Sequence, residues 1–511
     1  MNAADLNIFA SRLDAVCDEM GLVLRNTAFS PNIRDRLDFS CAIFDARGEL
    51  CAQAAHIPVH LGSMAFAMRD VVSAVDWQAG DQVVFNDPYL GGTHLPDVTM
   101  VAPLFVAGEL QAFLVNRAHH ADIGAASPGS MPISSSLHEE GLVLAPTHLQ
   151  QQGELQGAVV ERLRQATRNP HESLGDFNAQ MAANRAGIEA LRSVIEQYGV
   201  ARFAAGLAQL NDYAERLARA ALRVIPDGQY SFVDYLDDDG QGNRDIPIRV
   251  CLRVGNGAVQ ADFAGTAAQV SGNVNCPLAV AAAAVFYVFR CLMPPQTPAC
   301  AGAFRPISLS APQGSLVNAT RPAAVAAGNV ETSTRVVDVL LGALAEALPQ
   351  RIPAASHGSM NNLAMGAAGR HAWDYYETIG GGMGAHAGGD GLNGVQTHMT
   401  NTLNTPLEVL ESHYPLRLHR YAYRDGSGGA GARRGGDGLV REFEFLAPAH
   451  VTLLSERRSH RPWAIAGGQP GGYGRNLLNG TELSGKCEMM VEPGDRLRIE
   501  TPGGGGWGVS S

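Results

Sequence analysis

The stretch Asn86-Asp87-Pro88-Tyr89-Leu90-Gly91-Gly92-Thr93-His94-Leu95-Pro96-Asp97 organises the rest of the chain. It follows residues 82–85, an apolar run typical of a strand, and its proline and paired glycines end that strand. It then presents His94 and Asp97 three residues apart. The pattern predicts a strand that leads into a turn carrying an imidazole and a carboxylate.

A second cluster of the same kind follows the apolar residues 113–115. Residues 117–124 read Arg-Ala-His-His-Ala-Asp-Ile-Gly and carry His119, His120 and Asp122. Two strands that each end in such a turn can direct their side chains at one point. Imidazole and carboxylate ligands together suit a divalent ion such as zinc, manganese or iron. The two clusters therefore predict a metal site in the N-terminal region.

Spacing alone leaves a structural alternative open for each of these residues. A histidine or aspartate after a strand often caps a turn or binds the backbone without contacting a metal.

The sequence contains no standard motif of a metal, nucleotide or serine-hydrolase site. It has neither His-Glu-x-x-His nor Cys-x-x-Cys, and it lacks the G-x-x-x-x-G-K-[ST] loop and the G-x-S-x-G elbow. Residues 426–431 match G-x-G-x-x-G, but the next periodic segment alternates like a strand, which argues against a dinucleotide site.

Three further carboxylates are candidates for the site. Asp38 begins a predicted strand beside a polar loop, where it could reach the metal or form a surface salt bridge with Arg34 or Arg36. Glu139 and Glu140 close a long Ser/Pro/Gly loop. Each glutamate could be a ligand, a general base or a solvated loop charge, and we expect at least one to be solvated.

Composition restricts the class of protein. The 511 residues carry a net charge of -12 without a basic stripe, which argues against a nucleic-acid partner. The amino terminus has no signal-peptide pattern. The longest apolar run, residues 278–289, is shorter than the roughly 20 residues that cross a bilayer. The eight cysteines are also dispersed, and together these features favour a reduced, cytoplasmic protein without a membrane segment.

The hydrophobic pattern predicts a mixed α+β chain with several subdomains. Apolar residues at helical spacing predict helices at 3–26 and throughout 158–224, whereas alternation predicts strands between residues 229 and 272. The predicted regions are an N-terminal α/β region with the metal site at 1–157, a helical segment at 158–225, a small β region with a helix at 226–325, and a Gly-rich α/β region at 326–511.

Glycine is unusually frequent, and many of the 58 glycines follow residue 380. Apolar strand-like runs interleave with them, which argues against disorder. The glycines either let backbone N–H groups approach a substrate or form tight turns in a β structure, and the pattern favours neither. Trp507 follows four consecutive glycines, and we expect its ring to pack against another part of the chain.

Short motifs follow one another in order from about residue 25 to the carboxyl terminus: NDPYLGGTHLPDVT, RAHHADIG, SPGSMP, EEGL, AGNVETS, ETIGGGMGA, TNTLNTPLEVLE, YPLR, RDGSGGAG and TPGGGGWG. Together these segments resemble the hydantoinase B/5-oxoprolinase family. This family includes the B subunits of ATP-dependent hydantoinases and lactamases, and it is related to subunits of acetone and acetophenone carboxylases. The set is specific, although no single segment would be.

The resemblance implies one divalent metal ion and a partner subunit. The implied ligands are Asp38, His94, Asp97 and His119. His120 and Asp122 would lie nearby, as supporting residues or alternative ligands. A separate kinase-like A subunit would bind ATP and phosphorylate the substrate oxygen, in a hetero-oligomeric complex. The absence of a nucleotide loop from this sequence agrees with that division of labour.

The implied reaction is hydrolysis of a cyclic amide: hydantoin, N-methylhydantoin, 5-oxoproline or another lactam. Phosphorylation of the amide oxygen gives an imidate phosphate with a good leaving group. A metal would lower the pKa of the water that attacks the activated carbon. Glu139 or Glu140 would then handle the proton.

Two alternatives to hydrolysis remain open. The chain could be a subunit of an acetone/acetophenone-type carboxylase, or a non-catalytic scaffold for the A subunit with structural histidines.

The sequence departs from the family pattern at one loop. Gly124 is followed by Ala125 where the family pattern has two glycines. The chain also looks shorter than the carboxylase subunits of the family, and this favours hydrolysis.

Overall fold

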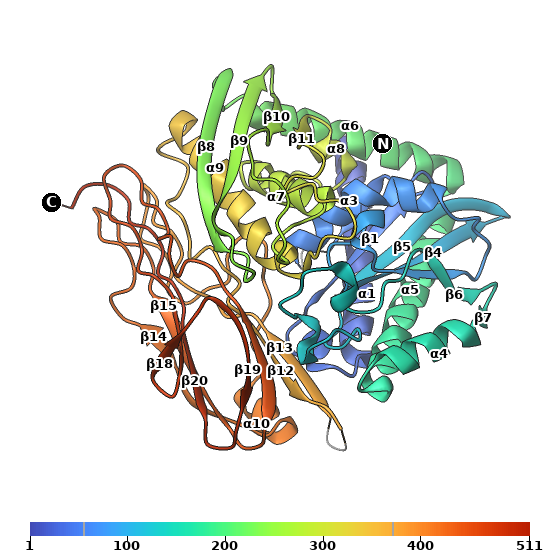
Figure 1. Cartoon of the computed structure of the whole chain (residues 1–511). Helices are drawn as coiled ribbons and strands as arrows, with labels where there is room; N and C mark the ends of the chain where they lie inside the picture. Colours follow the sequence, from blue (N-terminus) through green and yellow to red (C-terminus); the bar gives the residue numbers. More distant parts are fainter. Residues whose placement is uncertain (55–56, 370–371, 511) are drawn as a thin grey trace.

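A computed structural model of the chain describes residues 1–54, 57–369 and 372–510. The fold is mixed α+β, as the sequence predicts (Figure 1). The N-terminal sheet and the C-terminal strands lie on opposite sides of the molecule, with helices α7 (Leu278–Cys291) and α9 (Ser333–Ala347) between them. Across the described ranges, no helix is both long and apolar enough to cross a membrane.

Seven strands form the N-terminal sheet in the order β2-β1-β5-β4-β3-β6-β7, and every neighbouring pair is antiparallel. Their bounds are β1 Phe39–Asp45, β2 Leu50–Gln53, β3 Gln82–Phe85, β4 Asp97–Val106, β5 Glu109–His119, β6 Thr147–Gln151 and β7 Glu154–Leu155. The β4–β5 hairpin turns at Ala107 and Gly108, whose φ angles of 51° and 85° suit a two-residue turn between twisted strands.

Helices cover both faces of this sheet. Helices α1 (Ala3–Thr27) and α5 (Pro170–Tyr198) pack on the face to which Ile43 points. Helix α3 (Pro58–Ser73) packs on the opposite face, to which Phe44 points. Because successive side chains of a strand alternate between faces, burial on both sides explains the continuous apolar pattern of β1.

The middle of the chain forms helices and a second sheet, as predicted. Helix α5 is flanked by α4 (Gly157–Ala166) and α6 (Val200–Leu222). The sheet has the order β11-β10-β9-β8, and α9 packs on β8 and β9. The strand bounds are β8 Gly228–Asp238, β9 Arg244–Gly255, β10 Ala258–Asp262 and β11 Ile307–Ser310.

Two further sheets form the C-terminal region. One has the order β13-β12-β16-β19 and the other β14-β15-β20-β17-β18, and their apolar side chains share one buried core. The strand bounds are β12 Asn362–Ala367, β13 Trp373–Glu377, β14 Leu416–Arg424, β15 Gly438–Phe445, β16 Ala449–Leu454, β17 Arg475–Leu478, β18 Thr481–Leu483, β19 Lys486–Val491 and β20 Arg496–Glu500. The short helices are α2 Pro31–Arg34, α8 Ala301–Phe304 and α10 Leu407–His413.

Glycine-rich segments of this region pack backbone against backbone. Gly436 donates to the carbonyl of Met383 at 2.8 Å, and Gly504 donates to that of Gly436 at 2.9 Å. A Cβ atom at Gly436 would lie 1.9 Å from the carbonyl oxygen of Leu392, which excludes a side chain. These glycines therefore join chain segments into one structure. The backbone of Trp507 is held there, since its amide N–H donates to the Arg433 carbonyl at 2.9 Å, and its side chain is partly buried.

Candidate metal centre

Strand register brings three of the predicted ligands side by side. Asp97 begins β4 directly opposite His119, the last residue of β5. On the other side of β5, Phe39 pairs with Ala118, so Asp38 lies beside His119. The His119 amide donates to the Asp38 carbonyl at 3.0 Å. Residues from three parts of the sequence thus converge at one edge of the sheet, because β1, β5 and β4 are neighbours.

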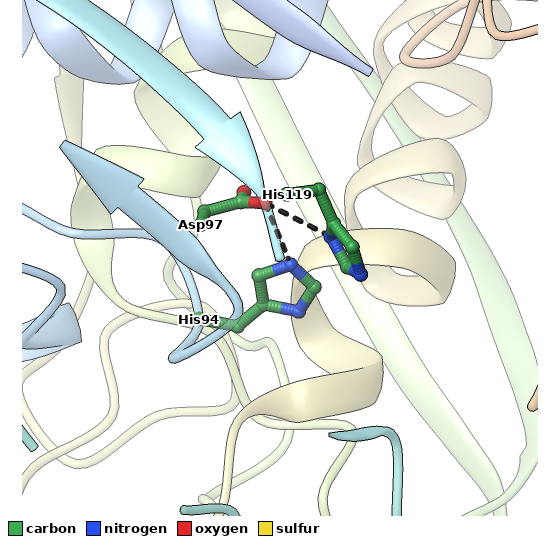
Figure 2. Close-up of side chains that lie close together, drawn as sticks. All are labelled: His94, Asp97 and His119. Atoms are coloured by element: carbon green, nitrogen blue, oxygen red, sulfur yellow. Dashed lines mark hydrogen bonds and ion pairs between the residues drawn. The ribbon is translucent and has the colours of Figure 1, made fainter. Parts of the chain in front are cut away.

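Asp97 is the centre of the group (Figure 2). Its Oδ1 atom lies 3.1 Å from His94 Nε2 and 3.1 Å from His119 Nδ1. All three side chains are buried, and one potential ligand atom from each lies within 4.8 Å of the others. Within the part of the chain that the structure describes, this is the one group of His, Cys, Asp or Glu with such spacing.

The donor set fits a divalent metal. The Nε2 atoms of His94 and His119 are buried and make no hydrogen bond, although His94 Nε2 is close to Asp97. Such buried polar atoms are costly unless a ligand satisfies them. His94 Nδ1–H donates to the Ala326 carbonyl at 3.1 Å, which leaves Nε2 as the lone-pair nitrogen. Two imidazoles and a carboxylate suit zinc, manganese or iron.

Electrostatics favours the metal-binding protonation state of two of the three residues, Asp97 and His119. Burial opposes ionisation of Asp97, but His94 and His60 outweigh it and hold the pKa of this carboxyl well below its usual range. Burial lowers the pKa of His119. Burial also acts to lower the pKa of His94, but the Asp97 carboxylate outweighs it and the pKa is raised. An ionised Asp97 and a neutral His119 are therefore ready to bind a cation.

Three side chains that the sequence did not single out hold the second carboxylate oxygen of Asp97. His60 Nε2 lies 3.2 Å from Asp97 Oδ2, Thr93 Oγ1 donates to it at 2.6 Å, and Asn329 Nδ2 donates at 3.1 Å. Asn329 belongs to η4 (Gly328–Thr332), a π-helical turn of the kind that recurs at functional sites. These contacts orient the carboxylate, so Oδ1 is left to face the two predicted histidine ligands.

His60 had one signal in the sequence. It lies in the first turn of α3, and His56 and His60 flank Pro58, the first residue of that helix. Histidines four residues apart around a helix start are a recognisable pair. His56 lies outside the described residues.

Asp38 lines a small cavity in front of Asp97 and His119. The cavity measures about 20 Å³, enough for a single water or ion. Asp38 is 6% exposed and stands outside the three-residue group, so its role as a fourth ligand stays a prediction. The alternative salt bridges are absent among the described residues, because Arg34 pairs with Asp35 and Arg36 binds side chains and carbonyls of other segments.

The C-terminal region closes this cavity. The Tyr376 ring stacks on the His119 imidazole, with 4.6 Å between ring centroids and 16° between planes. Its hydroxyl donates to Asn362 Oδ1 at 2.7 Å, and Asn362 Nδ2 donates to Glu331 Oε1 at 2.6 Å. Thr400 lines the same cavity. The site thus combines ligands of the N-terminal sheet with a cover from β13 and its neighbours.

The two loop glutamates have different environments. Glu140 is buried, and its Oε1 accepts from the N–H groups of Val325 and Ala326 at 2.8 and 2.9 Å. The Ala326 carbonyl in turn accepts from His94, so Glu140 holds the residue that orients this histidine. Burial raises the pKa of Glu140 to about 7. Glu139 is exposed and binds two serines of its own loop, which agrees with a solvated loop charge.

His120 and Asp122 make their contacts elsewhere. His120 Nε2 lies 3.0 Å from Gln180 Oε1 on α5. Asp122 pairs with Arg168, with 3.3 Å between Oδ1 and Nη1. The structure brings neither side chain into the group around Asp97, and their role as supporting residues or alternative ligands in catalysis stays a prediction.

Comparisons with known proteins agree with the resemblance found in the sequence. 5-Oxoprolinase 1 of Arabidopsis thaliana is 40% identical over 551 residues, which are 99% of this chain but 42% of that protein. The chain therefore spans about two fifths of the length of this relative. The crystal structure of ATP-dependent caprolactamase from Pseudomonas jessenii superposes with a TM-score of 0.92 at 29% identity, over 100% of this chain and 91% of that one.

A nucleotide-free acetone carboxylase shares the fold, with a TM-score of 0.88 at 17% identity over 99% of this chain and 76% of that one. The family described as Hydantoinase B/oxoprolinase matches residues 2–510. Its match extends over nearly every residue, including all the strand ends that form the His94–Asp97–His119 group. The chain belongs to the Hydantoinase B/oxoprolinase family.

Proposed function

We propose that this chain is the hydrolytic subunit of an ATP-dependent cyclic amide hydrolase. The observation that supports this most directly is the buried His94–Asp97–His119 group in a chain of this family. Likeness to a caprolactamase and to a 5-oxoprolinase supports an amide within a ring as the substrate. The sequence identity to acetone carboxylase is only 17%, so this similarity supports a shared fold and nothing more.

The metal would be held by His94, Asp97 and His119, with Asp38 as the proposed fourth ligand. When bound, a divalent ion supplies Lewis acidity that lowers the pKa of a water near the substrate carbon. The chain's own residues orient the ligands. The Ala326 carbonyl binds Nδ1 of His94 and so leaves Nε2 to face the metal. Burial of the site keeps bulk water from competing with the water molecule that attacks the substrate.

Glu140 is assigned a positioning role in this proposal. Its carboxylate binds two consecutive amides, and the carbonyl of the second one binds His94. Loss of that anchor would let the imidazole rotate, because nothing else holds Nδ1 in the described structure. Glu139 is not used, since its oxygens are bound to serines on an exposed loop.

The reaction requires a second activity. A kinase-like A subunit that uses ATP would phosphorylate the amide oxygen and make the ring carbon electrophilic. Water then adds to that carbon, the C–N bond breaks as the nitrogen takes a proton, and hydrolysis of the resulting acyl phosphate releases phosphate. Each ring opened consumes one ATP and two waters. More than half of the Arabidopsis thaliana relative lies outside the matching part, which leaves room for such an activity there.

Metal content is the first experiment. The purified chain is expected to carry about one zinc, manganese or iron ion, and His94→Ala is expected to lose it because a ligand is removed. His138→Ala is the matched control, since this histidine is exposed and outside the group. Equal metal contents in the wild-type chain and His94→Ala would contradict the assignment. No metal in any of the three proteins would favour the scaffold alternative.

Turnover is the second experiment. The chain is co-expressed with its kinase-like partner, and ADP formation is followed with hydantoin, 5-oxoproline or caprolactam. Hydrolysis predicts ring-opened product and ADP in equal amounts without bicarbonate. ADP formation that requires bicarbonate together with acetone would instead establish a carboxylase.

A further inference from the structure

A second, larger cavity adjoins the candidate metal centre. It measures about 420 Å³, a size typical of sites for small ligands. Thr400 lines both cavities, and Gly62, two residues after His60, lines the larger one. Its apolar wall includes Phe286 and Phe304, whose rings stack with centroids 4.5 Å apart. The larger cavity has room for a substituted ring, whereas the metal-site cavity does not.

Arg290 is the one permanently charged side chain among the described residues that line this pocket, and no carboxylate lines it there. Its Nη2 donates to the Thr297 carbonyl at 2.6 Å, but its buried Nη1 has no hydrogen-bond partner. Burial lowers the pKa of this guanidinium, and no described carboxylate opposes the effect. Partly buried arginines are normally paired with an acid, whereas Arg290 has no carboxylate partner among the described residues.

Tyr287 and His398 add polar groups on the same wall. Tyr287 lies one helical turn before Arg290 on α7, and its hydroxyl is 3.4 Å from His398 Nδ1. His398 has a φ of 61°, a left-handed conformation that residues other than glycine rarely adopt. Its Nε2 lies 4.0 Å from Asp338, which is held in turn by Arg457. The strained turn therefore keeps the imidazole in the pocket wall.

We propose that this pocket binds a phosphate-type oxyanion, with Arg290 as its cationic anchor and Tyr287 and His398 as further polar contacts. A chain with a net charge of -12 repels anions in general, so a carboxylate-free pocket with one arginine is a place where an anion can bind. The identity of the anion rests on the proposed function. It is the phosphorylated cyclic amide that approaches the metal centre, or the phosphate released from it.

Calorimetric titration of the full-length, metal-free chain with inorganic phosphate tests the pocket without any turnover. We expect saturable binding that weakens about tenfold or more in Arg290→Gln, because a charge-assisted pair is lost. Arg290→Lys should retain part of the affinity. Arg219→Gln is the matched control, since this arginine pairs with Glu215 on α6 and lies outside the pocket.

Two results would overturn the proposal: no saturable phosphate binding by the wild-type chain, or equal affinities of the wild-type chain and Arg290→Gln. Thermal unfolding shows whether each variant is folded. If Arg290→Gln is not, Tyr287→Phe replaces it, because it removes one hydroxyl from the same wall and should still weaken binding measurably. Unchanged affinity in that variant and in Arg290→Lys would then count against the site.

Turnover of the assembled complex distinguishes the two anions. If the pocket receives the phosphorylated substrate, Arg290→Gln forms less ring-opened product for each ATP consumed. If it holds released phosphate, inhibition by added inorganic phosphate is lost in the variant. Wild-type behaviour in both measurements would contradict any role in turnover. A complex that opens no cyclic amide refutes the proposed function, but the phosphate titration still decides whether the pocket binds anions.

Discussion

Replacement of Glu140 by glutamine is expected to change how the stability of the chain depends on pH. Burial raises the pKa of this carboxyl from its ordinary value of 4.5 to about 7 in the folded chain. Between pH 4.5 and about pH 7, Glu140 keeps its proton in the folded chain but has released it in the unfolded chain. Stability that is present at low pH is therefore lost as the pH rises, and the loss is complete above about pH 7.

The size of the effect follows from the two pKa values. A pKa that moves from 4.5 to about 7 on folding corresponds to about 3 kcal/mol once the pH exceeds both. About 2.5 kcal/mol of that loss develops between pH 5 and pH 8. Glutamine keeps the shape and an acceptor for the amides of Val325 and Ala326, but it does not ionise. The free energy of unfolding of Glu140→Gln, relative to that of the wild-type chain, should therefore rise by about 2.5 kcal/mol between pH 5 and pH 8.

Urea unfolding of the metal-free chain at several pH values measures this difference. The comparison with the wild-type chain is needed because burial also raises the pKa of Glu172, Glu331 and Asp374 to about 7. Glu139→Gln is the control, since Glu139 is exposed and its pKa is lowered despite slight burial, by hydrogen bonds from serines. Parallel pH profiles of the wild-type chain and Glu140→Gln would refute the reasoning.

Three further predictions concern the centre and its support. His60→Ala is expected to lower metal affinity about 10- to 100-fold by loss of a group that orients Asp97, and competition with a chelator measures this. Tyr376→Phe removes a hydroxyl but keeps the ring over the metal-site imidazole, so it should cost about 1 kcal/mol of stability without loss of metal. Gly436→Ala should destabilise the chain by about 3 kcal/mol or more in urea, because its Cβ would lie 1.9 Å from a carbonyl oxygen. Gly255→Ala, whose Cβ would meet no atom within 4 Å, is its control.

The group around Asp97 could be predicted because its pattern is local. An apolar run followed by a turn with histidine and aspartate is visible in a short stretch of sequence, and it occurs twice. Antiparallel pairing of β4 with β5 then places Asp97 opposite His119 without further information. The strand pattern alone did not decide between His119 and His120, whereas the family resemblance implied His119 as the ligand. Alternation along a strand sends neighbouring side chains to opposite faces, so the ring of His120 meets α5 instead.

Residues that arrive from other elements could not be found in this way. His60 comes from the start of α3 and Asn329 from a π-helical turn more than 200 residues after Asp97. Their contacts depend on how those elements pack on the sheet, which no local pattern encodes. The same holds for Glu139 and Glu140, which have the same chemistry in the sequence. Only the 3₁₀ turn Leu137–Glu139 and the packing of the loop decide which of them is buried.

The cavity also shows why the predicted regions 1–157 and 326–511 depend on each other. Asp97 and His119 come from the first region, whereas Tyr376 and Thr400, which close the cavity, come from the second. The first region alone would leave the imidazole of His119 without its stacked ring and expose it to solvent. In water a bound cation interacts more weakly with its ligands than in a buried site. The Gly-rich region therefore covers the candidate metal centre through Tyr376 and Thr400, while glycines such as Gly436 and Gly504 pack against backbone segments of the same region.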